Sequence, residues 1–186
     1  MNSMGRSVFS QYRTGSVLDV INKLDKEYYD ILEALAKQAG EYSYKLREKD
    51  QQREAEIYTG LSGKLAEEVK HYVRMRKGRV LPYVLTLTEK DATGHDCTNC
   101  SGGCNVKHSA QLLEIEESHQ HLRELLYRLN KVAPPIYTNT PFAELYQTLR
   151  NEMLIIDTTL TELFFLEESV LIPKIIEAQK KINARS

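Results

Sequence analysis

The chain has 186 residues, with 25 lysines and arginines against 26 aspartates and glutamates and a formal net charge of −1. This length suits one domain over residues 1–186, large enough to bury a core without disulfides, with 1–15 expected to be flexible. The balance of charge excludes a broad positive field, so we expect neither nucleic acid nor a membrane as a partner. No secretory signal or run of about 18 apolar residues occurs, which predicts a soluble, cytoplasmic protein.

The first predicted element is a helix that begins with Ser16 as its N-cap and ends at about Ala39, with Gly40 just beyond it. Apolar residues recur three and four positions apart over long segments of the chain, and alternation of period two is absent, which indicates an all-helical fold. The apolar stripe of this helix is expected to contain Val17, Ile21, Leu24, Tyr28, Ile31 and Leu35.

The second predicted helix lies within residues 41–77 and stops near Gly78, before the apolar run 80–85. Its residues 45–56 are almost all charged or glutamine, which favours a solvated helix or a mobile connection. The run 74–77, Arg-Met-Arg-Lys, is interpreted as the positive end of the helix, where cations meet its dipole favourably. The apolar stripe of the better-patterned part contains Leu61, Leu65, Val69, Tyr72 and Val73.

Two further helices are predicted after a loop at residues 90–107. The first runs from His108 to Asn130, and the second is capped by Thr140 and opened by Pro141. The stripe of the latter contains Phe142, Leu145, Leu149, Ile156, Leu160, Leu163, Glu167 and Leu171. Four long amphipathic helices predict an up-and-down four-helix bundle.

The predicted loop and the first residue of the helix after it gather all three cysteines of the chain and two of its five histidines. The spacing places His95, Cys97, Cys100, Cys104 and His108 within fourteen consecutive residues. Thiolate sulfur and imidazole nitrogen are ligands that zinc and iron prefer, and short spacers let one loop surround an ion. The simplest interpretation is tetrahedral zinc held by three cysteines and one histidine, with iron as the other candidate metal.

The three cysteines also fit chemistry different from a single bound ion. An iron-sulfur cluster would need a fourth ligand besides the three cysteines. Cys97 and Cys100 could instead alternate between dithiol and disulfide, with Cys104 as a resolving thiol, although no thioredoxin-like context surrounds them. A loop with inert cysteines is the remaining alternative.

Two polar residues interrupt apolar stripes on the last two predicted helices. Glu167 and His119 fall where side chains should be buried. A buried carboxylate must meet a cation, a metal or a hydrogen-bond donor, or take up a proton. Opposed histidine and glutamate could hold a metal in the bundle, but a His-Glu hydrogen bond would satisfy both groups without one, and Glu167 could instead tilt outward from the edge of its stripe. His71 lies off its helix's stripe, and His121 is expected on the surface.

The chain resembles the hemerythrin-like, cation-binding helical bundles, and more closely the di-iron proteins associated with repair of iron-sulfur clusters. The resemblance covers about residues 18–178. It rests on 21–29, 71–77 with Val80-Leu81-Pro82-Tyr83, 117–126, and above all Leu166-Glu167-Glu168-Ser169-Val170-Leu171-Ile172-Pro173.

The resemblance implies a di-iron site in the bundle, but most of its ligands are missing here. Tyr29 stands where the family has a histidine. Tyr72 and Arg76 stand at the histidine and glutamate positions before Pro82, and Leu163 and Glu167 at those before Pro173. His119 matches a family histidine, but Arg123 follows it where a carboxylate is expected.

Two interpretations of the interior therefore remain: a single ion held by some of His71, His119 and Glu167, or a bundle that has lost its iron site. In the second case, metal binding could have moved to the cysteine loop. The leading hypothesis is a metal-binding protein linked to metal homeostasis, stress or cluster repair. The alternatives are a non-enzymatic interaction module that docks a partner or a second copy, and a thiol redox sensor. The sequence contains no glycine-rich loop of the kind that holds phosphate and no nucleophile paired with a base. It therefore gives no support for a hydrolase or a nucleotide-binding enzyme.

Overall fold

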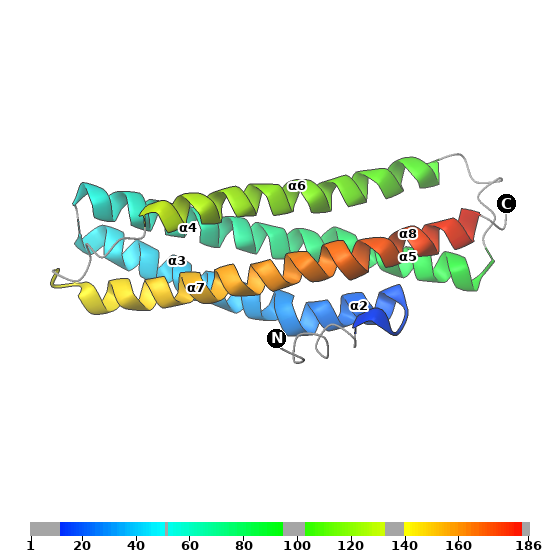
Figure 1. Cartoon of the computed structure of the whole chain (residues 1–186), viewed down its shortest axis with the longest axis horizontal. Coiled ribbons are helices and arrows are strands. Elements are labelled where there is room, and N and C mark those ends of the chain that lie inside the picture. Colours follow the sequence, from blue (N-terminus) through cyan, green and yellow to red (C-terminus); the bar gives the residue numbers. More distant parts are fainter. Residues whose placement is uncertain (1–11, 51, 95–102, 133–139, 184–186) are drawn as a thin grey trace, which may run out of the picture. The chain divides into compact units, whose positions relative to one another are not determined.

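The structure, a computed structural model, describes residues 12–50, 52–94, 103–132 and 140–183, and its regular elements there are all helical (Figure 1). Short π-helical turns, labelled η, join α-helices into longer stretches. The elements are α2 (Val17–Leu24), η1 (Asp25–Tyr29), α3 (Asp30–Lys49), α4 (Arg53–Met75), η2 (Arg76–Val80), α5 (Leu81–Ala92), α6 (Gly103–Val132), α7 (Ala143–Leu166), η4 (Glu167–Leu171) and α8 (Ile172–Asn183). Four long helical stretches result, as predicted for a helical bundle.

The first stretch begins where the sequence predicts and ends later. The Ser16 hydroxyl accepts a hydrogen bond from the Asp19 amide at 3.2 Å, and the Asp19 carboxylate accepts one from the Ser16 amide at 2.8 Å. This reciprocal cap lowers the pKa of Asp19, chiefly through the backbone hydrogen bond. The predicted end at Ala39 is wrong, because α3 continues through Gly40 to Lys49. Strong helix formers on both sides outweigh the modest cost of one glycine.

The second stretch also differs from its prediction at a glycine. The chain breaks at Asp50, whose extended backbone ends α3, and α4 begins at Arg53, so the charged segment is mostly helical. The predicted stop near Gly78 is wrong. The backbone passes through Gly78 as η2 and continues as α5.

Two of the π-turns immediately precede prolines. The Leu81 amide donates to the Arg76 carbonyl, and the Ile172 amide donates to the Glu167 carbonyl, five residues back in each case. Pro82 and Pro173 follow directly. Proline has no amide hydrogen and its ring clashes with the carbonyl four residues back, so a wider turn at this point lets the helix continue.

The predicted loop at 90–107 is too long at both ends. Helix α5 extends to Ala92 and α6 begins at Gly103, because extending an existing helix adds one hydrogen bond for each residue fixed. In the last stretch the Thr140 hydroxyl accepts from the Phe142 amide at 2.8 Å, and α7 begins at Ala143.

The chain divides into two compact units, each built from parts of all four stretches. The first unit holds α2, η2, α5, the start of α6, the end of α7, η4 and α8. Within it, α2, α5 and α8 pack against one another and η4 contacts α2. Its buried apolar residues include Ile21, Leu24, Val84, Leu87, Ile115, Leu171 and Ile175.

The second unit holds α3, α4 up to Arg74, the rest of α6, and α7 up to Thr161. The rings of Tyr58 on α4 and Tyr146 on α7 lie 6.4 Å apart, and the Tyr146 hydroxyl donates to Asp50 at 3.1 Å. Asn130 on α6 donates to Asp157 on α7 at 3.1 Å. The buried apolar residues of this unit include Leu32, Leu46, Leu65, Val69, Leu122, Leu129, Leu149 and Ile156. The prediction of a single domain over the whole chain stays a prediction.

Among the described residues, the helices are all too short or too polar to cross a lipid bilayer.

Candidate functional site

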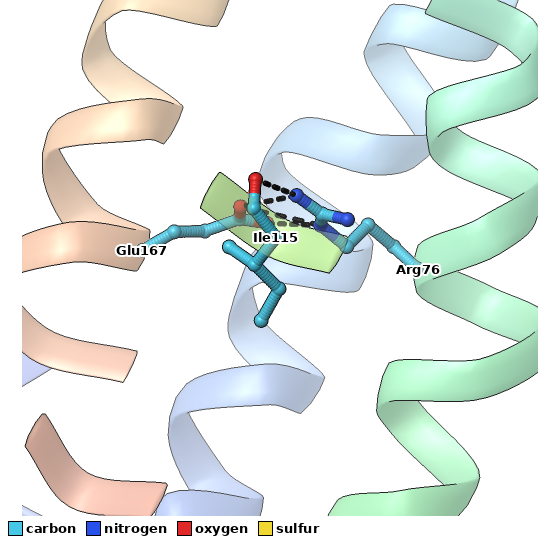
Figure 2. A network of polar contacts seen from close by, with 3 residues as sticks. All are labelled: Arg76, Ile115 and Glu167. Atoms are coloured by element: carbon cyan, nitrogen blue, oxygen red, sulfur yellow. Dashed lines mark hydrogen bonds and ion pairs between the residues drawn. The ribbon is translucent and has the colours of Figure 1, made fainter. Parts of the chain in front are cut away.

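The interior of the first unit contains a fully buried ion pair between Arg76 and Glu167 (Figure 2). The guanidinium donates from Nε to both carboxylate oxygens, at 2.9 and 3.2 Å, and from Nη2 to Oε2 at 3.0 Å. Nη2 also lies 3.5 Å from the carbonyl oxygen of Ile115 on α6. Neither charged side chain is exposed to solvent. Several short donor contacts to one carboxylate are the condition under which a buried pair offsets its loss of hydration.

The two partners occupy equivalent positions in similar segments. Arg76 is the first residue of η2 and Glu167 the first of η4, and each lies six residues before the proline that follows its turn. The shared local pattern, a π-turn closed by Leu-Pro or Ile-Pro, therefore presents a cation from one segment and an anion from the other.

The interpretation of Arg76 as part of the positive end of a helix is wrong. The helix does not end there, and Arg76 is 0% exposed. The burial of Arg76 could have been predicted from its position. Arg76 lies four residues after Tyr72 and four residues before Val80, so it continues the buried stripe. A buried arginine needs a carboxylate from another helix as its partner, and the buried carboxylate of Glu167 needs a cation. The two positions together therefore predict the pair.

The second unit contains a buried aromatic cluster of Tyr29, Tyr72 and His119. The rings of Tyr29 and Tyr72 meet edge to face with centroids 6.4 Å apart, and the rings of Tyr72 and His119 are tilted with centroids 6.2 Å apart. All three side chains are almost fully buried. The predicted burial of His119 is confirmed, and its ring packs against that of Tyr72.

Two further histidines, on helices α4 and α6, face solvent. His71 is exposed, as its position off the apolar stripe predicts, so it does not join His119 in the interior. His121 is also exposed, and its Nε2 lies 3.6 Å from a carboxylate oxygen of Glu68. Within the part of the chain that the structure describes, no group of three or more histidine, cysteine, aspartate or glutamate side chains is placed to hold a metal ion.

The cysteine and histidine segment is only partly described. His95, Cys97 and Cys100 lie outside the described residues. Cys104 and His108 belong to α6, four residues and hence about one helical turn apart. Metal ligation by these five residues stays a prediction.

The described side chains do not fit the di-iron centre that the resemblance implies. A bridging carboxylate must offer its oxygens to metal ions, whereas both oxygens of Glu167 accept from Arg76. The position expected to supply a second glutamate supplies that arginine, whose permanent positive charge repels a metal cation. Tyr29 and Tyr72, at positions of expected histidines, pack their rings together. No chemistry of bound iron follows from this interior.

Comparison with known proteins provides no relative from which the role of these residues could be inferred. No family model, no curated protein and no solved structure matches the chain. The hemerythrin-like assignment therefore rests on the sequence resemblance and stays a prediction.

Proposed function

We propose that this protein is a metal-binding helical bundle of the hemerythrin-like type, which holds zinc or iron at Cys97, Cys100 and Cys104 together with His95 or His108. In this proposal the bundle interior has a structural role, and the metal site is formed by residues 95–108, the last of which belong to the first turns of α6. The observation that carries the proposal is the buried pair of Arg76 and Glu167, because it commits the interior carboxylate to a guanidinium. With that carboxylate occupied, the cysteine and histidine segment 95–108 is the part of the sequence richest in metal ligands.

The ligand chemistry favours zinc over iron. Three thiolates and one imidazole complete a tetrahedral shell, which is the commonest geometry of structural zinc. Cys104 and His108 are one turn apart in α6, and ligands four residues apart on a helix can reach the same ion. Cys97 and Cys100 have the two-residue spacer of many zinc sites.

Elemental analysis of the purified chain tests this proposal. We expect about one zinc or iron per chain, since one tetrahedral shell accounts for the ligands present. Cys97→Ser and Cys100→Ser should lose the metal. The double variant Arg76→Met with Glu167→Leu is the control in the interior, because it removes the buried carboxylate without leaving a buried charge unpaired. It should keep the metal, provided circular dichroism shows that the variant is folded.

Two results would contradict the proposal. Unchanged metal content in the cysteine variants would remove the segment as the site. A metal-free chain that forms a reversible Cys97–Cys100 disulfide under mild oxidant would favour a thiol redox sensor instead.

A second candidate function is association with another protein, for which a second copy of the chain is the simplest partner. Leu154 and Ile155 are adjacent on α7 and are 64% and 47% exposed. Two large apolar side chains exposed at consecutive positions leave apolar surface in contact with water, and burying that surface would favour association. Sedimentation analysis should then show a dimer that Leu154→Lys dissociates, and a monomer at all concentrations would exclude a second copy.

A further inference from the structure

A groove of about 670 Å³ lies between α3 and α4 in the second unit. Gly40, Gly60 and Gly63 line it, and together they account for a third of the nine glycines in the chain. Because glycine has no side chain, these three positions add no side chain to the lining of the groove. The volume falls within the range of small-molecule sites.

The groove carries a local charge opposite to that of the whole chain. Five cationic side chains line it: Lys37, Lys45, Arg47, Lys64 and Lys70. The only carboxylates among its lining residues are those of Glu41 and Glu67. Lys70 contacts Glu67 at 2.8 Å, and setting this pair aside still leaves four cations against one anion. The net charge of the chain is −1, so the lining of the groove has a charge opposite in sign to that of the whole chain.

Helix packing does not account for the glycines. A Cβ atom at Gly60 would meet no atom within 4 Å, and one at Gly63 would meet the Ser43 Cβ at 3.7 Å, an ordinary contact. At Gly40 the nearest atom would be the ammonium nitrogen of Lys70, at 3.6 Å. Glycine inside a helix costs about 0.5–1 kcal/mol relative to alanine. The chain bears this cost at three positions that line the groove and where a Cβ atom would meet at most ordinary contacts.

We propose that the groove binds a small oligophosphate ligand. Several lysines and one arginine around a shallow space suit a ligand with several negative charges, because each ammonium acts as a point charge and the guanidinium can donate to two phosphate oxygens. The ring of Tyr44, which is 63% exposed, also lines the groove and offers a flat surface on which a nucleobase can stack. Recognition depends on side-chain cations rather than on a glycine-rich phosphate loop.

Calorimetric titration of the full chain with inorganic tripolyphosphate and, separately, with adenosine triphosphate tests the proposal. We expect both to bind with a Kd below about 1 mM at low salt and to bind more weakly as salt screens the groove. Equal affinities identify the phosphate chain as the recognised group, and tighter binding of the nucleotide identifies a nucleoside phosphate. Both outcomes support the proposal, whereas binding of neither compound would overturn it.

Charge reversal localises the binding. Lys37→Glu and Lys64→Glu should each weaken tripolyphosphate binding by about tenfold, since each replaces an attraction by a repulsion at close range. Lys26→Glu makes the same change at an exposed position in η1, outside the groove, and should alter the Kd less than about twofold. Equal weakening by all three variants would mean that only net charge matters and would overturn the proposal.

A second pair of variants separates the groove from its charge. Gly60→Leu adds a side chain to the lining of the groove without changing its charge and replaces a poor helix former by a good one. It should therefore keep the chain folded and raise the Kd by about tenfold. Gly78→Leu is the matched control in the first unit, where a Cβ would also meet no atom within 4 Å. Unchanged binding by Gly60→Leu, with its fold verified by circular dichroism, would contradict a ligand seated between α3 and α4.

Discussion

At the scale of single residues, the arrangement of Arg76 and Glu167 determines what the interior of the first unit can do. A carboxylate without water is unstable alone, and here its partner is a guanidinium that is always charged. Three short donor contacts hold the pair, and the Ile115 carbonyl lies beside it. Because the two charges neutralise each other, the interior needs no bound cation.

Removing one member of this pair should cost far more stability than removing both. Arg76→Met or Glu167→Leu alone leaves a buried charge without its partner and should lower the free energy of unfolding by about 3–5 kcal/mol. The double variant Arg76→Met with Glu167→Leu should lie within about 1 kcal/mol of the original chain or above it. Urea unfolding of the four proteins completes the cycle. Additive losses in the double variant would show that the two side chains do not act as a pair.

A tyrosine in the first unit should make stability depend on alkaline pH. Burial raises the pKa of Tyr83 to about 12, against the opposing effect of a hydrogen bond from Gln179. The folded pKa lies above the unfolded value of about 10, so this stabilising contribution is complete below pH 10 and is lost as the pH rises toward 12.

Urea unfolding of the original chain and of Tyr83→Phe measures this effect. The difference in unfolding free energy between the two proteins should be constant up to about pH 9 and should fall between about pH 10 and 12. A constant difference over the whole range would mean that Tyr83 ionises alike in the folded and unfolded chain.

The sequence pattern locates some of these residues but not their relationship. Glu167 and His119 stand out because each interrupts an apolar stripe, and both are buried. Arg76 does not stand out, because basic residues surround it and such a run commonly marks a helix end. Which side chains meet across helices depends on tertiary packing, which a pattern along one helix does not contain.

At the scale of elements, the π-turn η1 changes which residues of the first stretch are buried. A stripe drawn at ordinary helical spacing predicts Ile31 and Leu35 in the interior. In the structure Ile31 is 47% exposed, and Leu32 and Ala36 are fully buried instead. The wider turn of η1 lies just before these residues, and it moves the buried stripe by one position.

This shift predicts unequal effects of substitutions at neighbouring positions. Leu32→Ala should lower the free energy of unfolding by about 2–5 kcal/mol, because it removes a fully buried side chain. Ile31→Ala should change it by less than about 0.5 kcal/mol. Chemical unfolding of both variants checks which position is buried. A larger loss of unfolding free energy in Ile31→Ala than in Leu32→Ala would contradict the shift and favour the stripe drawn at ordinary helical spacing.

Helix types and most starting points follow from local chemistry, whereas several ends do not. The cap at Ser16 is readable because its hydrogen bonds join residues three apart. Gly40 and Gly78 have the local pattern of stops, yet both lie inside continuing helices. A glycine weakens a helix by an amount that packing on either side can offset, so its effect depends on contacts that the sequence alone does not supply.

At the scale of the whole molecule, the amphipathic pattern suffices to predict an all-helical protein with four long stretches. It does not predict that each stretch contributes to two compact units, because that division depends on contacts between distant segments. The candidate metal site rests on ligand type and spacing within 95–108. The candidate anion site between α3 and α4 could not be predicted from sequence, since its cations come from residues 37 to 70 and meet only in the folded unit.

The most direct test of metal binding by the cysteine and histidine segment is the X-ray absorption spectrum of the metal in the purified chain. Ligation by that segment predicts sulfur neighbours at about 2.3 Å, together with nitrogen at about 2.0 Å. Binding in the bundle interior would instead give only nitrogen and oxygen neighbours. A spectrum with sulfur in the first coordination sphere agrees with the proposed site, and one without sulfur contradicts it.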